Sequence, residues 1–253
     1  KRGYKAPKPE EINEVEPVEE TFDGKSTTAN VFNSLDEGAS KTEEWVAGNQ
    51  KIILGVVGVI AAAAIGYFAY AKFYAAPKED TAATEMFQAQ QYFEQAVNAP
   101  AANDSLYKLA LNGGEGKPGF LNIIENHAGT DAANLAEYYA GTAFLNTGKF
   151  KEAVEHLEKF KSDDEVLNAM AAGATGDAFA QLKKNEDALE FYDKAASIVK
   201  NDLITPRYLF KAGQLALSVN KKEEALKYFK EIQTNFSTSA EGANIDAYVA
   251  MAE

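Results

Sequence analysis

An uncharged apolar run from Ile52 to Ala71 dominates the pattern of hydrophobic and polar positions. Lys51 and Lys72 bracket it. A helix needs about 20 apolar residues to cross the hydrocarbon core of a bilayer. A buried core helix would carry polar residues at helical spacing, and the apolar part of a signal peptide is shorter and follows a brief basic stretch. The run therefore predicts one transmembrane helix, placed at residues 51–76.

Small residues recur on one face of this predicted helix. Gly58, Ala62 and Gly66 are four residues apart, and Gly55 lies beside them. Small side chains let the backbone of a second membrane helix approach closely. The stripe Gly55, Gly58, Ala62 and Gly66 is therefore a candidate contact with a partner helix.

Residues 1–50 form a polar tail with two parts. The stretch 1–25 is rich in proline and glutamate and has too few large apolar residues to fold, so disorder is expected there. From Ser26, apolar residues fall near one helical face, and Thr27 or Thr28 is suited to cap a helix. This pattern predicts an amphipathic juxtamembrane helix, which either docks on a protein partner or lies at the membrane surface.

The pattern over residues 77–253 is helical and repetitive. Gly141, Gly176 and Gly213 follow one another at intervals of 35 and 37 residues, and alanines and aromatics accompany them at similar offsets. Repeats of this length indicate helix hairpins that stack on their neighbours. A glycine on the first helix of each hairpin lets the second helix cross closely.

This spacing resembles the tetratricopeptide repeat over Asn134 to about Phe236. The departures are specific. The position where the family often has tryptophan is occupied by Glu137, Ala172 and Leu209. The turn glycine is replaced by Lys183 and Asn220. The predicted fold is all-α, with a single N-terminal transmembrane helix followed by a tetratricopeptide-like helical-hairpin solenoid over residues 77–253.

The two ends of the array also resemble one another. Residues 120–139 align with residues 229–248 at a constant offset of 109, which places Thr130 and Ser239 before the next helix as caps. The glycine-rich stretch Asn112 to Gly119 predicts a loop that divides the first unit. Thr205 followed by Pro206 predicts a helix start.

Charge and composition narrow the function. Residues 73–253 carry 17 Lys plus Arg against 27 Asp plus Glu, so binding to a nucleic-acid backbone is disfavoured. Cysteine is absent and there are two histidines, His127 with an expected packing role and His156 expected on a solvated face. The acidic cluster at 163–165 fits a turn and the first turn of a helix better than a metal site. The sequence therefore predicts a binding protein without catalytic residues, metal or cofactor.

The resemblance to tetratricopeptide repeats implies a concave binding face lined by the first helix of each hairpin. The predicted groove residues are Tyr138, Thr142, Leu145, Asn146, Met170, Asp177, Gln181, Arg207, Phe210, Gln214 and Leu217. Such a groove, apolar with scattered polar groups, suits a helix or an extended apolar segment, although the same side chains also suit packing between repeats.

The layout of polar tail, one span and acidic helical-repeat domain resembles the YfgM-like ancillary subunit of the bacterial Sec translocon. This resemblance implies an inner-membrane protein with a cytoplasmic N-terminus and a periplasmic repeat domain. Its implied partners are translocon subunits, a membrane-anchored peptidyl-prolyl isomerase and exported polypeptides. The numbers of lysines near the two ends of the span are equal, so the charges do not indicate which end is cytoplasmic. The alternative function is a scaffold that tethers a defined cell-envelope or outer-membrane assembly complex.

Overall fold

The computed structural model describes the backbone of residues 27–100 and 103–253, with their side chains apart from those of 27–37 and 41. The disorder predicted for residues 1–25 lies outside these ranges. Within them the chain forms helices and no strand, and Gly114 and Lys117 make an isolated antiparallel bridge. The all-α class predicted from the sequence is therefore confirmed.

The chain divides into two compact units, one ending at Tyr67 and one running from Phe68 to Glu253. Helix α1 spans Thr27–Tyr70, so it begins at the threonine pair that the sequence marks as a helix start. The helical stretch Gly38–Asn98 is long and apolar enough to cross a membrane, and its most apolar window is not buried inside the protein. It is the one stretch of the described residues that meets this test.

The helix changes its winding where the apolar run ends. Residues Ala71–Ala75 form a π-helical turn, η1, between α1 and α2 (Ala76–Asn98). The rings of Tyr70 and Tyr74 stack at this turn with their centroids 5.3 Å apart. Tyrosines are enriched at the polar boundary of membrane helices, where the hydroxyl meets water and the ring meets lipid.

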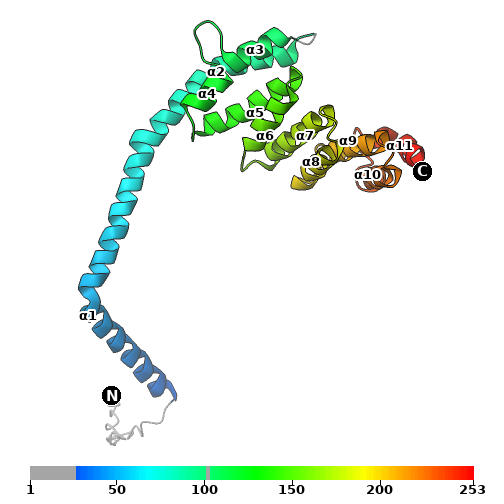
Figure 1. Cartoon of the computed structure of the whole chain (residues 1–253). Helices are drawn as coiled ribbons and strands as arrows, with labels where there is room; N and C mark the ends of the chain where they lie inside the picture. Colours follow the sequence, from blue (N-terminus) through cyan, green and yellow to red (C-terminus); the bar gives the residue numbers. More distant parts are fainter. Residues whose placement is uncertain (1–26, 101–102) are drawn as a thin grey trace, which may run out of the picture. The chain divides into compact units, whose positions relative to one another are not determined.

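The second unit is a row of helix hairpins (Figure 1). Its helices after α2 are α3 (Asp104–Asn112), α4 (Phe120–Asn126), α5 (Asp131–Asn146), α6 (Phe150–Lys159), α7 (Glu165–Gln181), α8 (Asn185–Ile198), α9 (Thr205–Ser218), α10 (Lys222–Asn235), the 3₁₀ turn η2 (Gly242–Asn244) and α11 (Ile245–Ala252). The pairs α5 with α6, α7 with α8 and α9 with α10 pack within hairpins, and each hairpin also contacts the next. This is the tetratricopeptide-like arrangement that the sequence predicts.

The repeated glycines mark the closest approach within each hairpin. A Cβ atom on Gly141 would lie 2.5 Å from the Leu157 side chain, and one on Gly213 would lie 2.4 Å from the ring of Phe229. At Gly176 the neighbour is the ring of Tyr192, at 2.7 Å. The residue packed on each glycine comes sixteen positions later in all three hairpins. The predicted role of the glycines is confirmed.

Each first helix ends in the same turn, seven residues after its repeat glycine. Gly148, Lys183 and Asn220 have φ angles of 75°, 60° and 61°. The following residue then donates its N–H to a carbonyl five residues back, as Lys149 does to Phe144 over 2.9 Å. The hairpins therefore keep one turn conformation even where the glycine is replaced, and Lys183 adopts a left-handed conformation that L side chains disfavour.

The predicted loop and cap positions also agree with the structure. Thr130 caps α5 by accepting the Ala133 N–H at 3.1 Å. Ser239 accepts the Gly242 N–H at 3.0 Å in the same way, but a 3₁₀ turn intervenes before α11. Residues 113–119 of the predicted loop separate α3 from α4, and Asn112 is the last residue of α3. Helix α9 begins at Thr205, as predicted.

Candidate protein-binding groove

The residues predicted to line the groove lie on the first helices α5, α7 and α9, and they differ in exposure. The exposed ones are polar: Asn146, Gln181, Arg207 and Gln214. The half-buried ones are Tyr138, Thr142, Leu145, Met170, Asp177, Phe210 and Leu217. The polar groups thus face solvent, while most of the larger apolar side chains are shared with the core.

Phe210 shows how the apolar members are used. Its ring packs edge-on against Tyr248 of α11 with centroids 4.7 Å apart, and it lies 6.1 Å from the ring of Phe229 on α10. Met170, Leu145 and Leu217 likewise pack against the buried clusters of the repeats. Much of the surface of these side chains is therefore used in contacts between neighbouring helices.

Asp177 is fully engaged within the protein. Its carboxylate accepts a hydrogen bond from the Tyr192 hydroxyl at 2.7 Å and receives the Lys211 Nζ at 2.7 Å on each oxygen. Lys211 also lies 5.9 Å from the ring centroids of Tyr192 and Tyr208. The cluster joins α7, α8 and α9, so Asp177 connects two repeats across their first helices.

Tyr208 lies directly over Gly173, where a Cβ atom would come 1.9 Å from Cε1 of the ring. The side chain is 6% exposed, and its hydroxyl makes no hydrogen bond with any residue that the structure describes. Burial, the Asp177 carboxylate and the neighbouring Tyr138 raise the pKa of Tyr208 to about 12. The hydroxyl therefore keeps its proton at neutral pH and remains a hydrogen-bond donor.

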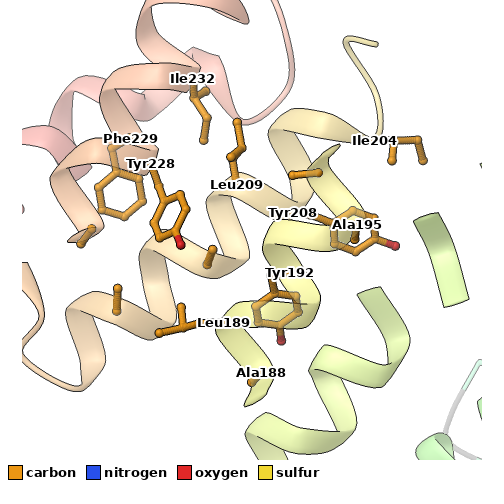
Figure 2. Close-up of a cluster of buried hydrophobic side chains, with 14 of the residues drawn as sticks. Ala188, Leu189, Tyr192, Ala195, Ile204, Tyr208, Leu209, Tyr228, Phe229 and Ile232 are labelled. Carbon is orange, nitrogen blue, oxygen red and sulfur yellow. The ribbon is translucent and has the colours of Figure 1, made fainter. Parts of the chain in front are cut away.

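Figure 2 shows buried aromatic and aliphatic side chains of α8, α9 and α10, together with Ile204 just before α9, which belong to one core cluster. Tyr192 and Tyr228 take part through their rings, and the Tyr228 hydroxyl donates to Asp193 at 2.9 Å. Burial is the main cause that raises the pKa of both tyrosines. Tyr192, Tyr208 and Tyr228 are thus buried side chains of the core between the C-terminal repeats, and they keep their protons at neutral pH.

One expectation about the histidines is wrong. His156 was expected on a solvated face, but its ring is half-buried, stacks on Phe144 with centroids 5.2 Å apart, and pairs with Glu137 of α5 at 2.5 Å. The nearby residues Glu155, Glu158 and Lys159 are charged and exposed, which hid the inward-facing position of His156. His127 has the predicted packing position at a helix end, and its Nε2 also pairs with Glu85 of α2 at 2.8 Å.

The acidic cluster has the structural role expected for it. Asp164 caps α7 by accepting the N–H groups of Val166 and Leu167 at 2.8 and 3.2 Å. Within the described part of the chain, no three potential metal-ligating side chains gather into a group.

Sequence reasoning missed Lys211, Tyr208 and Gly173. Tyr192 is one of the aromatic residues that accompany the repeat glycines, but nothing in the local sequence pattern pairs it with Asp177. A contact across 34 residues, such as the one between Asp177 and Lys211, depends on how successive hairpins are rotated. The signal for Tyr208 was its place in the first helix of a hairpin, close to the predicted Arg207.

Comparison with known proteins gives a limited result. No family model matches the chain. A solved structure described as a Podosopora anserina putative kinesin light chain with nearly identical tetratricopeptide-like repeats is similar over 67% of this chain and 83% of its own, at 12% identity and a TM-score of 0.48. The repeated glycine contacts and turns described above show that the chain is an array of helix hairpins with a tetratricopeptide-like arrangement.

Proposed function

We propose that this chain is a non-catalytic, membrane-anchored repeat protein that binds other proteins through the first-helix face of its hairpins. The observation that carries the proposal is the set of exposed hydrogen-bonding groups on that face. Gln181 of α7 and Arg207 and Gln214 of α9 are all exposed. Helical-repeat arrays use such extended surfaces to bind polypeptides.

In the more specific form of the proposal, the protein is an accessory subunit of the Sec translocon in a bacterial inner membrane. The tail is cytoplasmic, the span covers about residues 51–76, and the repeats assist exported polypeptides in the periplasm beside a membrane-anchored peptidyl-prolyl isomerase. The order of one apolar helix followed by an acidic repeat unit supports this assignment. A reporter that is active only in the cytoplasm, fused after Glu253, should be silent, and strong activity would reverse the orientation.

The groove is tested with the double variant Arg207→Ala with Gln214→Ala in the full chain. Crosslinking to an unfolded polypeptide should fall several-fold, because an exposed cation and an amide are lost from the binding face. Lys222→Ala with Thr234→Ala is the matched control, since both side chains are exposed on the second helix α10. Unchanged crosslinking in the groove variant would refute this site. If the groove variant no longer co-purifies with translocon subunits but still crosslinks to the unfolded polypeptide, the alternative function as a scaffold is the better description.

The proposed translocon contact lies in the span. A Cβ atom on Gly55, Gly58 or Gly66 would meet nothing within 4 Å, so these positions are open to another helix. Gly58→Leu should reduce co-purification of translocon subunits in mild detergent, because the larger side chain holds the helices apart. Ala64→Leu adds similar bulk away from the stripe and should have little effect. Equal co-purification of both variants would remove the stripe from the proposal.

A further inference from the structure

Helix α2 carries a second apolar face that the predicted groove does not include. Phe87 and Val97 are 60% and 56% exposed, although both belong to the packed repeat unit. They border a cavity of about 400 Å³ to which Phe93, Glu94 and Tyr139 also contribute. The adjoining face of α2 fills the core, with buried residues Ala82, Met86, Ala89, Tyr92 and Ala96.

The exposed face has the spacing of a helix-binding surface. Phe87, Gln90, Glu94 and Val97 are separated by three, four and three residues, so they form one stripe along α2. Ten residues of helix rise by about 15 Å between the two apolar ends. A helix of three turns has a similar length, and side-chain ridges spaced in this way pack into the grooves of a second helix.

The floor of this cavity is preformed. Phe93 meets the rings of Tyr107, Phe120 and Tyr139 edge-on, at centroid distances of 5.7, 6.1 and 5.1 Å. Tyr139 and Phe120 stack at 5.1 Å with an angle of 7° between their planes. Four helices, α2 to α5, therefore fix the floor, and a ligand would not have to order it. Preorganisation of this kind reduces the cost of binding.

Charge identifies the chemistry of the occupant. Glu94 lies in the middle of the stripe, forms no ion pair with a described residue, and has no basic side chain among the residues that line the cavity with it. The residues from Phe73 onward also carry ten more acidic than basic side chains. A cationic group beside an apolar side chain would satisfy both features, and the surplus negative charge would attract it from a distance.

We propose that the α2 groove, defined by Phe87, Gln90, Phe93, Glu94, Val97 and Tyr139, binds a basic amphipathic helix of a protein partner. The proposal rests on the protein-binding function and adds a second site with its own ligand chemistry. Apolar side chains of the partner helix enter between Phe87 and Val97. A lysine or arginine of the partner pairs with Glu94.

The test uses the full chain in phosphatidylcholine nanodiscs and two labelled 18-residue peptides, with empty discs as the background. Both peptides place leucine on one helical face, and the other face is lysine in one peptide and glutamate in its twin. Fluorescence anisotropy should show at least tenfold tighter binding of the lysine peptide. Phe87→Ala should weaken that binding at least fivefold, whereas Leu203→Ala, which trims an exposed apolar residue elsewhere, should not.

Charge exchange separates specific pairing from general attraction. Glu94→Lys should weaken binding of the lysine peptide far more than Glu190→Lys, an equal change of charge at an exposed position on α8. Equal effects of the two changes would overturn the proposal. So would loss of self-association in Phe87→Ala, measured by sedimentation, because the occupant would then be a second copy of this chain.

The outcome also distinguishes this site from the first-helix groove. If Phe87→Ala leaves peptide binding unchanged while Arg207→Ala with Gln214→Ala lowers crosslinking to unfolded polypeptide, the α2 proposal fails and the protein-binding function stands. If neither variant changes either measurement, both proposals fail.

Discussion

The contact between Gly173 and Tyr208 gives a stability prediction whose sign depends on the packing of two repeats. In Gly173→Ala, the added methyl would lie 1.9 Å from Cε1, 2.2 Å from Cζ and 2.5 Å from the hydroxyl oxygen of Tyr208. A shift of a few tenths of an ångström cannot relieve three such contacts with a rigid ring. The ring must therefore leave its place, or α9 must move away from α7.

The magnitude follows from two opposing effects. Replacing glycine by alanine within a helix stabilises it by about 1 kcal/mol, because the unfolded chain loses conformational freedom. Removing a buried large side chain from its site costs about 3 kcal/mol. Gly173→Ala should therefore lower the free energy of unfolding by about 2 kcal/mol net. In a Tyr208→Ala background the clash is absent, and the same change should raise it by about 1 kcal/mol.

A double-mutant cycle measures this difference. Urea unfolding of the full chain in nanodiscs, followed by far-ultraviolet circular dichroism, gives the four free energies. The expected coupling between the two sites is about 3 kcal/mol. If Gly173→Ala stabilises the otherwise unchanged protein, then Tyr208 does not lie over Gly173, and the described geometry of the α7–α9 contact is wrong.

Three further predictions concern single positions. Lys183→Gly should raise the free energy of unfolding by about 1 kcal/mol in urea titrations, because it relieves a positive φ angle, and no gain would contradict that strain. The pKa of Tyr208 is raised from 10.0 to about 12 in the folded protein. The contribution of the protonated Tyr208 side chain to the free energy of unfolding is therefore complete below pH 10 and is lost as the pH rises toward 12. Between pH 8 and pH 11, the free energy of unfolding should fall by about 1 kcal/mol more in the unchanged protein than in Tyr208→Phe. Equal decreases in the two proteins would argue against the raised pKa. Glu79→Gln should lower the free energy of unfolding by about 1 kcal/mol and speed hydrogen exchange at the start of α5. The reason is that the Glu79 carboxylate accepts hydrogen bonds from the N–H groups of Asp131 and Ala132 at 2.7 and 2.8 Å. Unaltered exchange would refute this role.

The sequence was most informative where one helix or one hairpin decides the structure. The glycine intervals predict the close approach of Gly141 to Leu157 because both residues belong to one hairpin with a fixed turn. The caps at Thr130 and Asp164 follow from side chains that bond within three residues. Local chemistry fixes these features, and a repeat pattern reveals them.

Contacts between units were harder to predict. Glu79 lies 52 and 53 residues before the two residues of α5 whose N–H groups its carboxylate binds, and Asp177 meets Lys211 across 34 residues. Such pairs depend on the angle between stacked hairpins, which helical periodicity does not encode. His156 was misplaced for a related reason, because charged neighbours in the sequence say little about a side chain that turns toward Glu137 on another helix.

The repeats differ in how they use their aromatic side chains, and this difference affects both proposed binding surfaces. Near the C-terminal end, Tyr248 of α11 packs edge-on against Phe210, and the exposed side chains of α9 include the polar Arg207 and Gln214. At α2 no described helix covers Phe87, which remains 60% exposed. The proposed first-helix groove would therefore offer polar groups, whereas the proposed α2 groove would offer an apolar and acidic surface. An array of identical repeats would not offer two different surfaces. The departures from the repeat pattern are therefore the features that would allow this chain to distinguish its partners.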